Sequence, residues 1–294
     1  MNTQLAPTFQ DAEKLDTAED TLTSGIADFM SQSGFSQCHL GLSGGLDSAL
    51  VAYLAVQALG KENVVCLILP SRFTSQQSLD DAVALAENLG CRHETISIEP
   101  LYDGFIKTLS PLFGNRPFDT TEENLQARIR GTLLMAYANK FHSMLLATSN
   151  KSELAMGYCT LYGDTCGGLA PIGNLFKTEV IELCRRINEK KRFFSGNDII
   201  PAAIISKPPS AELRPNQKDQ DTLPPYEVLD SVLRFHYTSR FDEASRFDEE
   251  TSAKKIAETL GVKEELAVSI FATVSASEFK RRQFPPVLPY GKER

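Results

Sequence analysis

Residues 43–48, with the sequence SGGLDS, carry the clearest chemical signal in the chain. They lie between a short apolar run at 38–42 and a longer one that begins at Ala49. This order predicts a glycine-rich turn that joins a buried strand to a helix. At the start of a helix the backbone N–H groups are unpaired and the helix dipole is positive, so the turn is suited to bind an anion such as phosphate.

The turn carries a carboxylate, Asp47, but no lysine. It matches neither the P-loop pattern nor the dinucleotide fingerprint, and Asp47 would repel a bare phosphate. If the turn binds phosphate, we expect a divalent cation between the phosphate and Asp47. The alternative is an ordinary strand–helix turn in which Ser43 or Asp47 only caps the helix.

Strands and helices alternate around this turn. Apolar runs and helical spacing predict strands at 38–42, 64–69, 93–98 and 143–148 and helices at 16–30, from Ala49 to near Gly60, at 78–89 and from Thr120 to about Asn139, where Thr120 and Glu123 have capping-box spacing. The alternation favours an α/β fold with a doubly wound parallel sheet. In such a fold ligands bind beyond the carboxyl ends of the strands, where the turn at 43–48 lies.

The character of the chain changes after Pro201, where prolines interrupt an irregular segment. Three helices are predicted beyond it, at 226–233, about 251–260 and about 264–271. We interpret the chain as one domain, with a nucleotide-binding core at about 16–205 and a lid and helical annex at about 206–294. The sequence SRFDE occurs at Ser239 and again at Ser245, which we interpret as a duplicated surface turn.

Composition excludes several classes of protein. The 294 residues are 42% hydrophobic, and 30 Lys and Arg against 38 Asp and Glu give a net charge of -8. This balance argues against disorder and against nucleic acid as a principal partner. The longest apolar run, at 64–69, is too short to span a bilayer, and the first residues have no signal-peptide pattern. The six cysteines have no metal-site spacing, so we expect reduced thiols in a cytoplasmic protein.

The string SGGLDS at the first strand–helix turn resembles the pyrophosphate-binding loop of the adenine-nucleotide ligases, which split ATP into AMP and pyrophosphate. Further strings, at 122–130, 146–153, 157–164, 171–178, 207–213 and 280–283, resemble the NAD synthetase family. The resemblance extends in order over roughly residues 20–286. It implies a Rossmann-like, adenine nucleotide alpha-hydrolase-like fold with a C-terminal helical annex.

The resemblance also implies a reaction. ATP and nicotinic acid adenine dinucleotide would bind together, and the pyridine carboxylate would attack the α-phosphorus to form an acyl-adenylate and pyrophosphate. Ammonia would then displace AMP to give NAD, with Mg²⁺ as the cofactor. A homodimer is implied as well, with the helix at 121–139 in its interface.

Site residues follow from the same resemblance. ATP is expected at Gly41, Leu42, Ser43, Gly44, Gly45, Leu46, Asp47, Ser48, Thr148, Lys177 and Ser210. The dinucleotide substrate is expected at Asn124, Arg128, Glu153, Tyr158, Cys159, Thr160, Leu161 and Lys280. Asp47 and Glu153 would hold the metal, and Asp47, Lys177 and Asp164 would be catalytic, the last near the attacking ammonia. Leu161 and Gly168 depart from the pattern of the small ammonia-using enzymes, which often have lysine and an acidic residue there.

Several of these residues also have ordinary structural interpretations. Asn124 and Arg128 are four residues apart on one predicted helix face, but Arg128 could instead pair with Glu122 or Glu123. Asn150 and Glu153 have capping-box spacing, and Asp164 could simply close a turn after Gly163. Thr148 could be a polar strand end, and Lys177 and Ser210, as single residues, could be solvated or incidental.

The nitrogen donor and two other functions stay open. Only about forty residues precede the glycine turn, so we expect no N-terminal nitrilase-like glutaminase domain and take ammonia as the default donor. Residues 226–230 and 279–286, however, are more similar to the glutamine-dependent branch, so a separate glutaminase partner is an alternative. A tRNA-modifying ligase would need a basic surface that the composition does not suggest. A non-catalytic nucleotide sensor is disfavoured because Asp47, Glu153 and Lys177 are all present.

Overall fold

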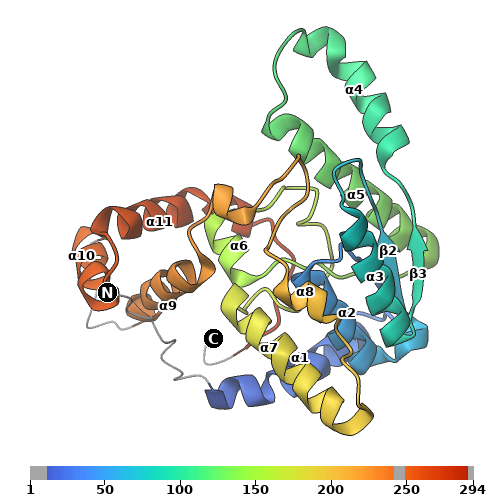
Figure 1. Ribbon diagram of the computed structural model, residues 1–294, viewed down its shortest axis with the longest axis horizontal. Helices are drawn as coiled ribbons and strands as arrows, with labels where there is room; N and C mark the ends of the chain where they lie inside the picture. The colour runs from blue at the N-terminus through green and yellow to red at the C-terminus, as the bar shows by residue number, and fades with distance from the viewer. Residues whose placement is uncertain (1–11, 242–248, 291–294) are drawn as a thin grey trace.

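The computed structural model describes residues 12–241 and 249–290, which form a parallel sheet covered by helices and a separate group of C-terminal helices (Figure 1). In chain order the elements are α1 (Ala12–Gln32), β1 (Cys38–Gly41), α2 (Leu46–Leu59), η1 (Lys61–Asn63), β2 (Val64–Ile68), α3 (Gln76–Leu89), β3 (Arg92–Thr95), α4 (Glu99–Phe113), α5 (Thr120–Phe141), β4 (Met144–Leu145), α6 (Lys151–Met156), α7 (Lys177–Ser195), α8 (Ala202–Ser206), η2 (Asp219–Asp221), α9 (Tyr226–Phe241), α10 (Glu249–Leu260), α11 (Glu264–Ala276) and α12 (Glu278–Arg281).

The sheet has the strand order β3-β2-β1-β4, and all its pairings are parallel. Cys38 at the start of β1 pairs with Val64 of β2 on one side and with Met144 of β4 on the other. Because the strands are parallel and in this register, their carboxyl ends lie along one edge of the sheet. The predicted α/β fold with a parallel sheet is therefore confirmed.

Strand β2 shows why helices must cover both faces. All five of its residues are buried, and alternate side chains enter two different cores. Val64, Cys66 and Ile68 pack with α1, α2, α3 and α7, whereas Val65 and Leu67 pack with α4 and α5. Successive side chains of a strand point to opposite faces, so a continuous apolar run needs a core on each side.

Several predicted elements differ in detail from those observed. The N-cap of α5 is Asp119, whose carboxylate accepts from the Thr121 N–H while Glu122 caps in return. The predicted pair, Thr120 and Glu123, is therefore wrong by one residue. Strands β3 and β4 are shorter than predicted, because β4 pairs with β1 over only two residues. Helix α4 was not predicted, since prolines lie at its start and within it.

Helices α9, α10 and α11 confirm the three helices predicted after the proline-rich segment. They share an apolar core of their own, which includes Leu229, Val232, Ile256 and Ile270. Ala155 of α6 and Phe176 before α7 belong to the same core, so this C-terminal annex packs directly on the elements that carry Glu153 and Lys177. The two copies of SRFDE lie mostly outside the described residues.

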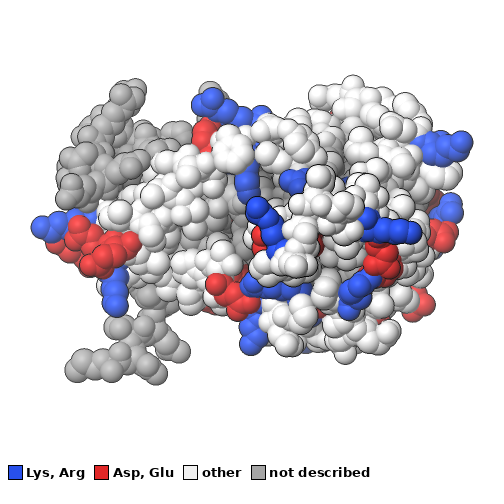
Figure 2. Space-filling model, turned by 90° about the horizontal axis from the view of Figure 1, so that it is seen from above, with Lys and Arg blue, Asp and Glu red and all other residues white. Residues whose placement is uncertain are grey.

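The surface and the thiols fit the expectations from composition. On the face shown in Figure 2, basic and acidic side chains are interspersed across the middle and right, and an area at the upper right carries few charges. The six cysteines are free, and Cys38, Cys66, Cys91 and Cys184 are buried. Within the described residues, no helix has the length and apolar character needed to cross a membrane.

Candidate active site

A cavity of about 350 Å³ opens at the carboxyl edge of the sheet. Its walls come from the turn after β1, from residues 67–70 at the end of β2, from residues 145–149 at the end of β4, and from α5. The segment 207–213 of the lid covers it from the other side. Its size is within the range of small-molecule sites, and its position is the one expected for a parallel α/β sheet.

Residues of the glycine turn form one wall of the cavity. Helix α2 begins after Gly45, which makes no side-chain cap bond, so neither Ser43 nor Asp47 caps the helix as the structural alternative proposed. Ser43 and Ser48 instead bond to each other and to the turn's own backbone. Gly44 has φ +75°, and a Cβ there would lie 2.1 Å from the Ser78 carbonyl oxygen. Only glycine allows this close packing against α3.

Asp47, Lys177 and Glu153 meet at the base of the cavity. The Lys177 ammonium contacts the Asp47 carboxylate and lies 3.8 Å from Oε1 of Glu153. Asn150 donates to the second oxygen of Asp47 at 2.9 Å, and its own side chain accepts from the Glu153 N–H. The predicted Asn150–Glu153 capping box is confirmed. Glu153 therefore takes part in the cap of α6 and also lies beside Lys177.

Burial and neighbouring charges shift the pKa values of Lys177 and Glu153. The side chain of Lys177 is 4% exposed. Burial alone would lower the pKa of its ammonium, but the adjacent carboxylates of Asp47 and Glu153 outweigh it and hold the pKa above its usual value. Burial raises the pKa of Glu153, and the nearby negative charge of Asp47 adds to the rise. The interpretation of Lys177 as an ordinary solvated lysine is wrong.

The residues expected to bind the dinucleotide gather around the turn at 158–164. Asn124 accepts from the Thr160 hydroxyl at 2.6 Å, and Arg128 donates to the Leu161 carbonyl at 3.2 Å. The two side chains therefore contact one segment of the chain; their binding to one ligand stays a prediction. Glu123 pairs with Arg214 at 3.6 Å. Among the described contacts, Arg128 does not pair with Glu122 or Glu123.

Lys280 holds the same segment from the C-terminal side. Its ammonium donates to the carbonyl oxygens of Gly157 and Cys159, at 2.6 and 2.8 Å. The Tyr158 hydroxyl is 3.4 Å from Asp219. Of this group, Tyr158 lines the cavity itself, whereas Lys280 acts on the backbone behind it.

Asp164 closes a turn and also lines the cavity; its catalytic role stays a prediction. Its carboxylate accepts from the Thr160 N–H at 2.7 Å, which closes the turn. The residue is exposed on the wall of the cavity, where the surrounding protein still limits the solvation of its carboxylate. This desolvation raises the pKa of Asp164 to about 6, although the Thr160 N–H and the charge of Lys280 oppose the rise.

Thr148 and Ser210 line the cavity from opposite sides. Thr148 follows β4, and Ser210 lies in the lid, where its hydroxyl donates to the Gln217 carbonyl at 2.6 Å. Beside Ser210, the carboxylate of Glu212 accepts from the Ser75 and Ser78 hydroxyls at 2.9 and 2.7 Å. The lid is thus fastened to the start of α3, which packs against the glycine turn.

Sequence reasoning did not assign roles to Asp219, Arg130, Lys207 or Glu212, all of which line the cavity. Asp219 is buried and accepts from the Tyr226 hydroxyl at 2.8 Å. Burial lowers the pKa of Arg130 to about 10, and its Nε donates to the Leu69 carbonyl. Lys207 and Glu212 lie within the string at 207–213, which could have singled them out.

The donor set suits Mg²⁺, provided that a ligand completes it. Asp47 and Glu153 direct carboxylates at the same point, occupied by the Lys177 ammonium, and carboxylate oxygens are the protein ligands that Mg²⁺ prefers. Among residues 12–241 and 249–290 there is no group of three or more His, Cys, Asp or Glu side chains that could hold a metal ion. A bound Mg²⁺ would therefore also need phosphate oxygens and water.

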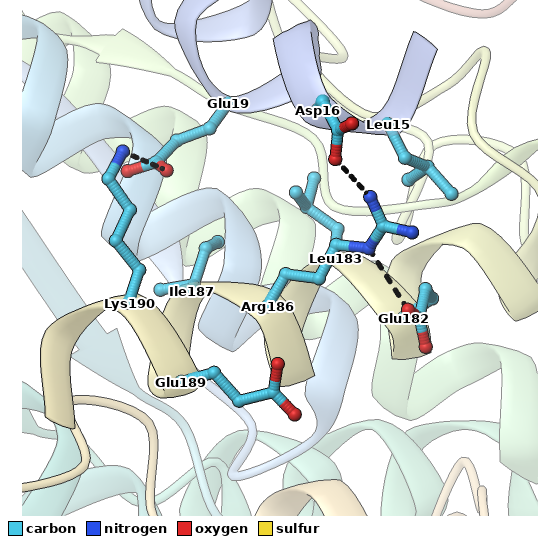
Figure 3. A pocket seen from close by; sticks show the side chains of 9 residues that line it. All are labelled: Leu15, Asp16, Glu19, Glu182, Leu183, Arg186, Ile187, Glu189 and Lys190. Atoms are coloured by element: carbon cyan, nitrogen blue, oxygen red, sulfur yellow. Dashed lines mark hydrogen bonds and ion pairs between the residues drawn. The ribbon is translucent and has the colours of Figure 1, made fainter. Parts of the chain in front are cut away.

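A second hollow lies between α1 and α7, on a different side of the molecule (Figure 3). Arg186 pairs there with Asp16 and, at 3.0 Å, with Glu182, and Lys190 pairs with Glu19 at 3.1 Å. These cations are neutralised by carboxylates of the hollow itself. The cavity at the sheet edge adjoins the glycine turn and contains Lys177, and it is the candidate phosphate site.

A parallel α/β sheet with a lysine-free glycine turn and a buried Asp47–Lys177 pair defines a nucleotide-binding class of α/β protein. Comparison with known proteins narrows the class. The family described as NAD synthase matches residues 19–284, and the chain belongs to this family.

Individual relatives agree with this membership. A glutamine-dependent NAD(+) synthetase of Synechocystis sp. is 49% identical over 276 residues, which are 93% of this chain and 46% of that protein. The solved structure of glutamine-dependent NAD+ synthetase from Acinetobacter baumannii, in complex with ADP, has a TM-score of 0.64 and 36% identity over 95% of this chain and 49% of the other. The NH3-dependent NAD synthetase from Campylobacter jejuni has a TM-score of 0.69 and 27% identity over 94% of this chain and 99% of the other. The chain spans about half the length of the curated relatives it matches.

Proposed function

We propose that the chain catalyses the ATP-dependent amidation of nicotinic acid adenine dinucleotide to NAD, the last step of NAD biosynthesis. The observation that carries this proposal is the cluster of Asp47, Glu153 and the buried Lys177 at the glycine turn. Such a cluster can hold the pyrophosphate end of ATP while the α-phosphorus stays open to attack. Membership of the NAD synthase family supports the choice of substrate.

In the first step the pyridine carboxylate oxygen attacks the α-phosphorus of ATP. A P–O bond forms to give the acyl-adenylate, and the bond to the β-phosphate breaks to release pyrophosphate. Both partners are anions, so neutralisation of charge matters more than proton transfer. Backbone N–H groups of the turn at 43–48 would hold the leaving pyrophosphate, and Lys177 would supply the positive charge that the turn lacks.

A Mg²⁺ ion held by Asp47 and Glu153 would screen the phosphate charges from these carboxylates. Thr148 and Ser210, on opposite walls of the cavity, would position phosphate oxygens with their hydroxyls. Asn124, Arg128, Tyr158, Cys159, Thr160, Leu161 and Lys280 would form or support the binding surface of the dinucleotide.

In the second step ammonia attacks the carbonyl carbon of the acyl-adenylate and AMP leaves. Ammonium must first lose a proton, and we assign this role to Asp164; its position on the cavity wall supports the assignment. A carboxylate with a pKa of about 6 is ionised at neutral pH but is a better base than an ordinary aspartate. Asp164 would therefore hold the ammonium and accept its proton.

Ammonia is the nitrogen donor in this proposal. A separate glutaminase is the alternative, which the similarity to glutamine-dependent relatives supports. The chemistry at Asp164 is the same in both cases, since each delivers ammonia to the cavity.

We also propose a homodimer formed through α4 and α5. Helix α4 projects from the body of the molecule (Figure 1), and its Leu101, Phe105 and Leu112 are 44%, 48% and 80% exposed. Met135 and Phe141 of α5 are exposed as well. Apolar side chains grouped in this way favour burial against another surface, and the family resemblance places α5 in the interface.

The test is to incubate purified protein with ATP, Mg²⁺ and nicotinic acid adenine dinucleotide, with either ammonium or glutamine, and to measure NAD, AMP and pyrophosphate. NAD with equimolar AMP and pyrophosphate from ammonium alone supports the activity and the donor. Product from glutamine only after addition of a glutaminase supports the alternative donor. Absence of NAD under all these conditions would refute the proposed function.

A further inference from the structure

Helix α9 of the annex presents three side chains to the start of α7. Tyr226, Asp230 and Arg234 are each four residues apart, so they lie along one face of the helix. The Tyr226 ring centre is 5.6 Å from the Lys177 ammonium, and Arg234 pairs with Glu179 at 2.9 Å. Asp230 lies between them and meets the backbone from which Lys177 extends.

The Asp230 carboxylate is 1% exposed and binds two donors. Its Oδ2 accepts from the Thr178 N–H at 2.9 Å, and its Oδ1 accepts from the Ser152 hydroxyl at 2.5 Å. The Ser152 oxygen in turn accepts from the Lys177 N–H at 2.9 Å. One carboxylate therefore fixes the N–H groups of both residues that begin α7, one directly and one through Ser152.

These bonds provide acceptors for backbone N–H groups at the start of α7 that the N-cap side chain does not bind. The first N–H groups of a helix have no partner within it, and the N-cap of α7 is Phe176, whose side chain makes no cap bond. A carboxylate at this end is also favoured by the helix dipole. The cap is supplied by a helix of the annex, 52 residues farther along the chain.

We propose that Asp230 is a positioning residue for Lys177. Through Ser152 and Thr178 it sets the point on the backbone from which the Lys177 ammonium reaches Asp47 and the cavity. Asp230 does not line the cavity, so it acts on ATP only through Lys177. The inference rests on the proposed function. It means that the annex contributes to ATP binding, because Asp230 of α9 positions Lys177.

Asp230→Asn tests this role with little change in size. Its one carbonyl oxygen replaces two carboxylate oxygens, so Thr178 N–H and the Ser152 hydroxyl cannot both keep the acceptors they have now. The amide can then bond to Ser152 only by donating to its oxygen, which changes the acceptor of the Lys177 N–H. Displacement of a reacting group by about 1 Å can cost about 100-fold in rate, and we expect ATP·Mg²⁺ binding to weaken at least about 10-fold. Arg234→Met is the control, because it removes the ion pair with Glu179 and the contact with the Phe176 ring but leaves the bonds of Asp230 to Ser152 and Thr178 in place. We expect less than about a 3-fold change.

A double-mutant cycle separates positioning from a general structural role. The affinity for ATP·Mg²⁺ is measured by titration calorimetry for the wild type, Asp230→Asn, Lys177→Met and the double variant, each shown to be folded by thermal unfolding. If Asp230 acts through Lys177, Asp230→Asn has little further effect once Lys177 is replaced. An equal weakening in both backgrounds, or wild-type affinity of Asp230→Asn, would overturn the proposal.

Ser152→Ala provides a second route if Asp230→Asn does not fold. It removes the acceptor of the Lys177 N–H, and we expect the same loss of affinity and the same dependence on Lys177; wild-type affinity would again overturn the proposal. Because the cycle measures binding of ATP, it reports on positioning even if no NAD is formed. Failure of the wild type to make NAD would refute the proposed function alone.

Discussion

The ammonium group of Lys177 contacts the carboxylate of Asp47, a residue 130 positions earlier in the chain. Asp47 lies in the first turn of α2 and Lys177 is the first residue of α7, so two helix starts converge on one point. The glycine turn itself lacks a cation, and this contact provides one directly beneath it. The arrangement is suited to bind an anion whose charge grows during the reaction.

Replacement of Asp47 by Asn should abolish most turnover. The change removes the partner of Lys177 and one of the two carboxylates expected to bind Mg²⁺, so we expect kcat to fall at least about 100-fold with little change in circular dichroism. Asp16→Asn, which breaks the Arg186 pair in the hollow of Figure 3, is the control and should keep normal activity. Near-normal kcat in Asp47→Asn would contradict the assigned role.

Gly44→Ala should impair both folding and ATP binding. The φ of +75° disfavours alanine, and the added Cβ would meet the Ser78 carbonyl oxygen at 2.1 Å. Gly34 has the same φ but no atom within 4 Å of its Cβ position, so Gly34→Ala isolates the backbone cost of about 1–2 kcal/mol. We expect Gly44→Ala to lose about 1–3 kcal/mol more, measured by urea unfolding. Equal losses in the two variants would show that the close packing is unimportant.

The pH profile should report the ionisation of Asp164. Its pKa of about 6 means that the carboxylate becomes protonated as the pH falls through that value, so kcat at saturating ammonium should fall there. Asp164→Asn should be much slower and should lack this limb of the profile. If the fall in kcat near pH 6 persists in Asp164→Asn, another group causes it and the assignment to Asp164 is wrong.

The same shift has a consequence for stability. Because the pKa of Asp164 is raised in the folded state, folded protein binds the proton more tightly than the unfolded chain does. The contribution to stability is complete below the unfolded pKa of about 4 and is lost as the pH rises through about 6. Asp164→Asn should therefore melt at a higher temperature than the wild type at pH 8, and a lower one would contradict the burial argument.

A charge on α4 should weaken the proposed dimer. Leu112→Asp places a carboxylate on the most exposed apolar side chain of that helix, and we expect the sedimentation coefficient to shift toward the monomer. Phe193 is 85% exposed at the end of α7, and Phe193→Asp is the control that should leave association unchanged. A wild-type monomer, or equal effects of both substitutions, would exclude the α4 interface.

The elements of the fold were largely predictable because their signals are local. The apolar run at 38–42, the two glycines and the following apolar helix identify β1, the turn and α2, and glycines mark the ends of α2 and α3. Helix α4 was missed because Pro100 and Pro111 resemble helix breakers, although Pro100 lies where proline is tolerated at a helix start.

The sequence identified part of the cavity lining, including Asp47, Glu153 and Lys177, but not how these residues are arranged. The contacts of Asp47 with Asn150 and Lys177 join residues 103 and 130 positions apart, which no local pattern specifies. The resemblance to NAD synthetases supplied the roles, because Asn150 alone indicates only a helix cap. Asp219 and Asp230 were not assigned, since buried carboxylates are recognised only once their donors are placed around them.

The most direct test of the account is a structure of the protein with ATP and Mg²⁺. We predict that the β- and γ-phosphates lie against the backbone N–H groups of residues 43–48, with Lys177 in contact with them and Mg²⁺ bound by Asp47 or Glu153. A triphosphate bound elsewhere, for example in the hollow between α1 and α7, would contradict the central claim that the lysine-free turn and the distant Lys177 form one phosphate site.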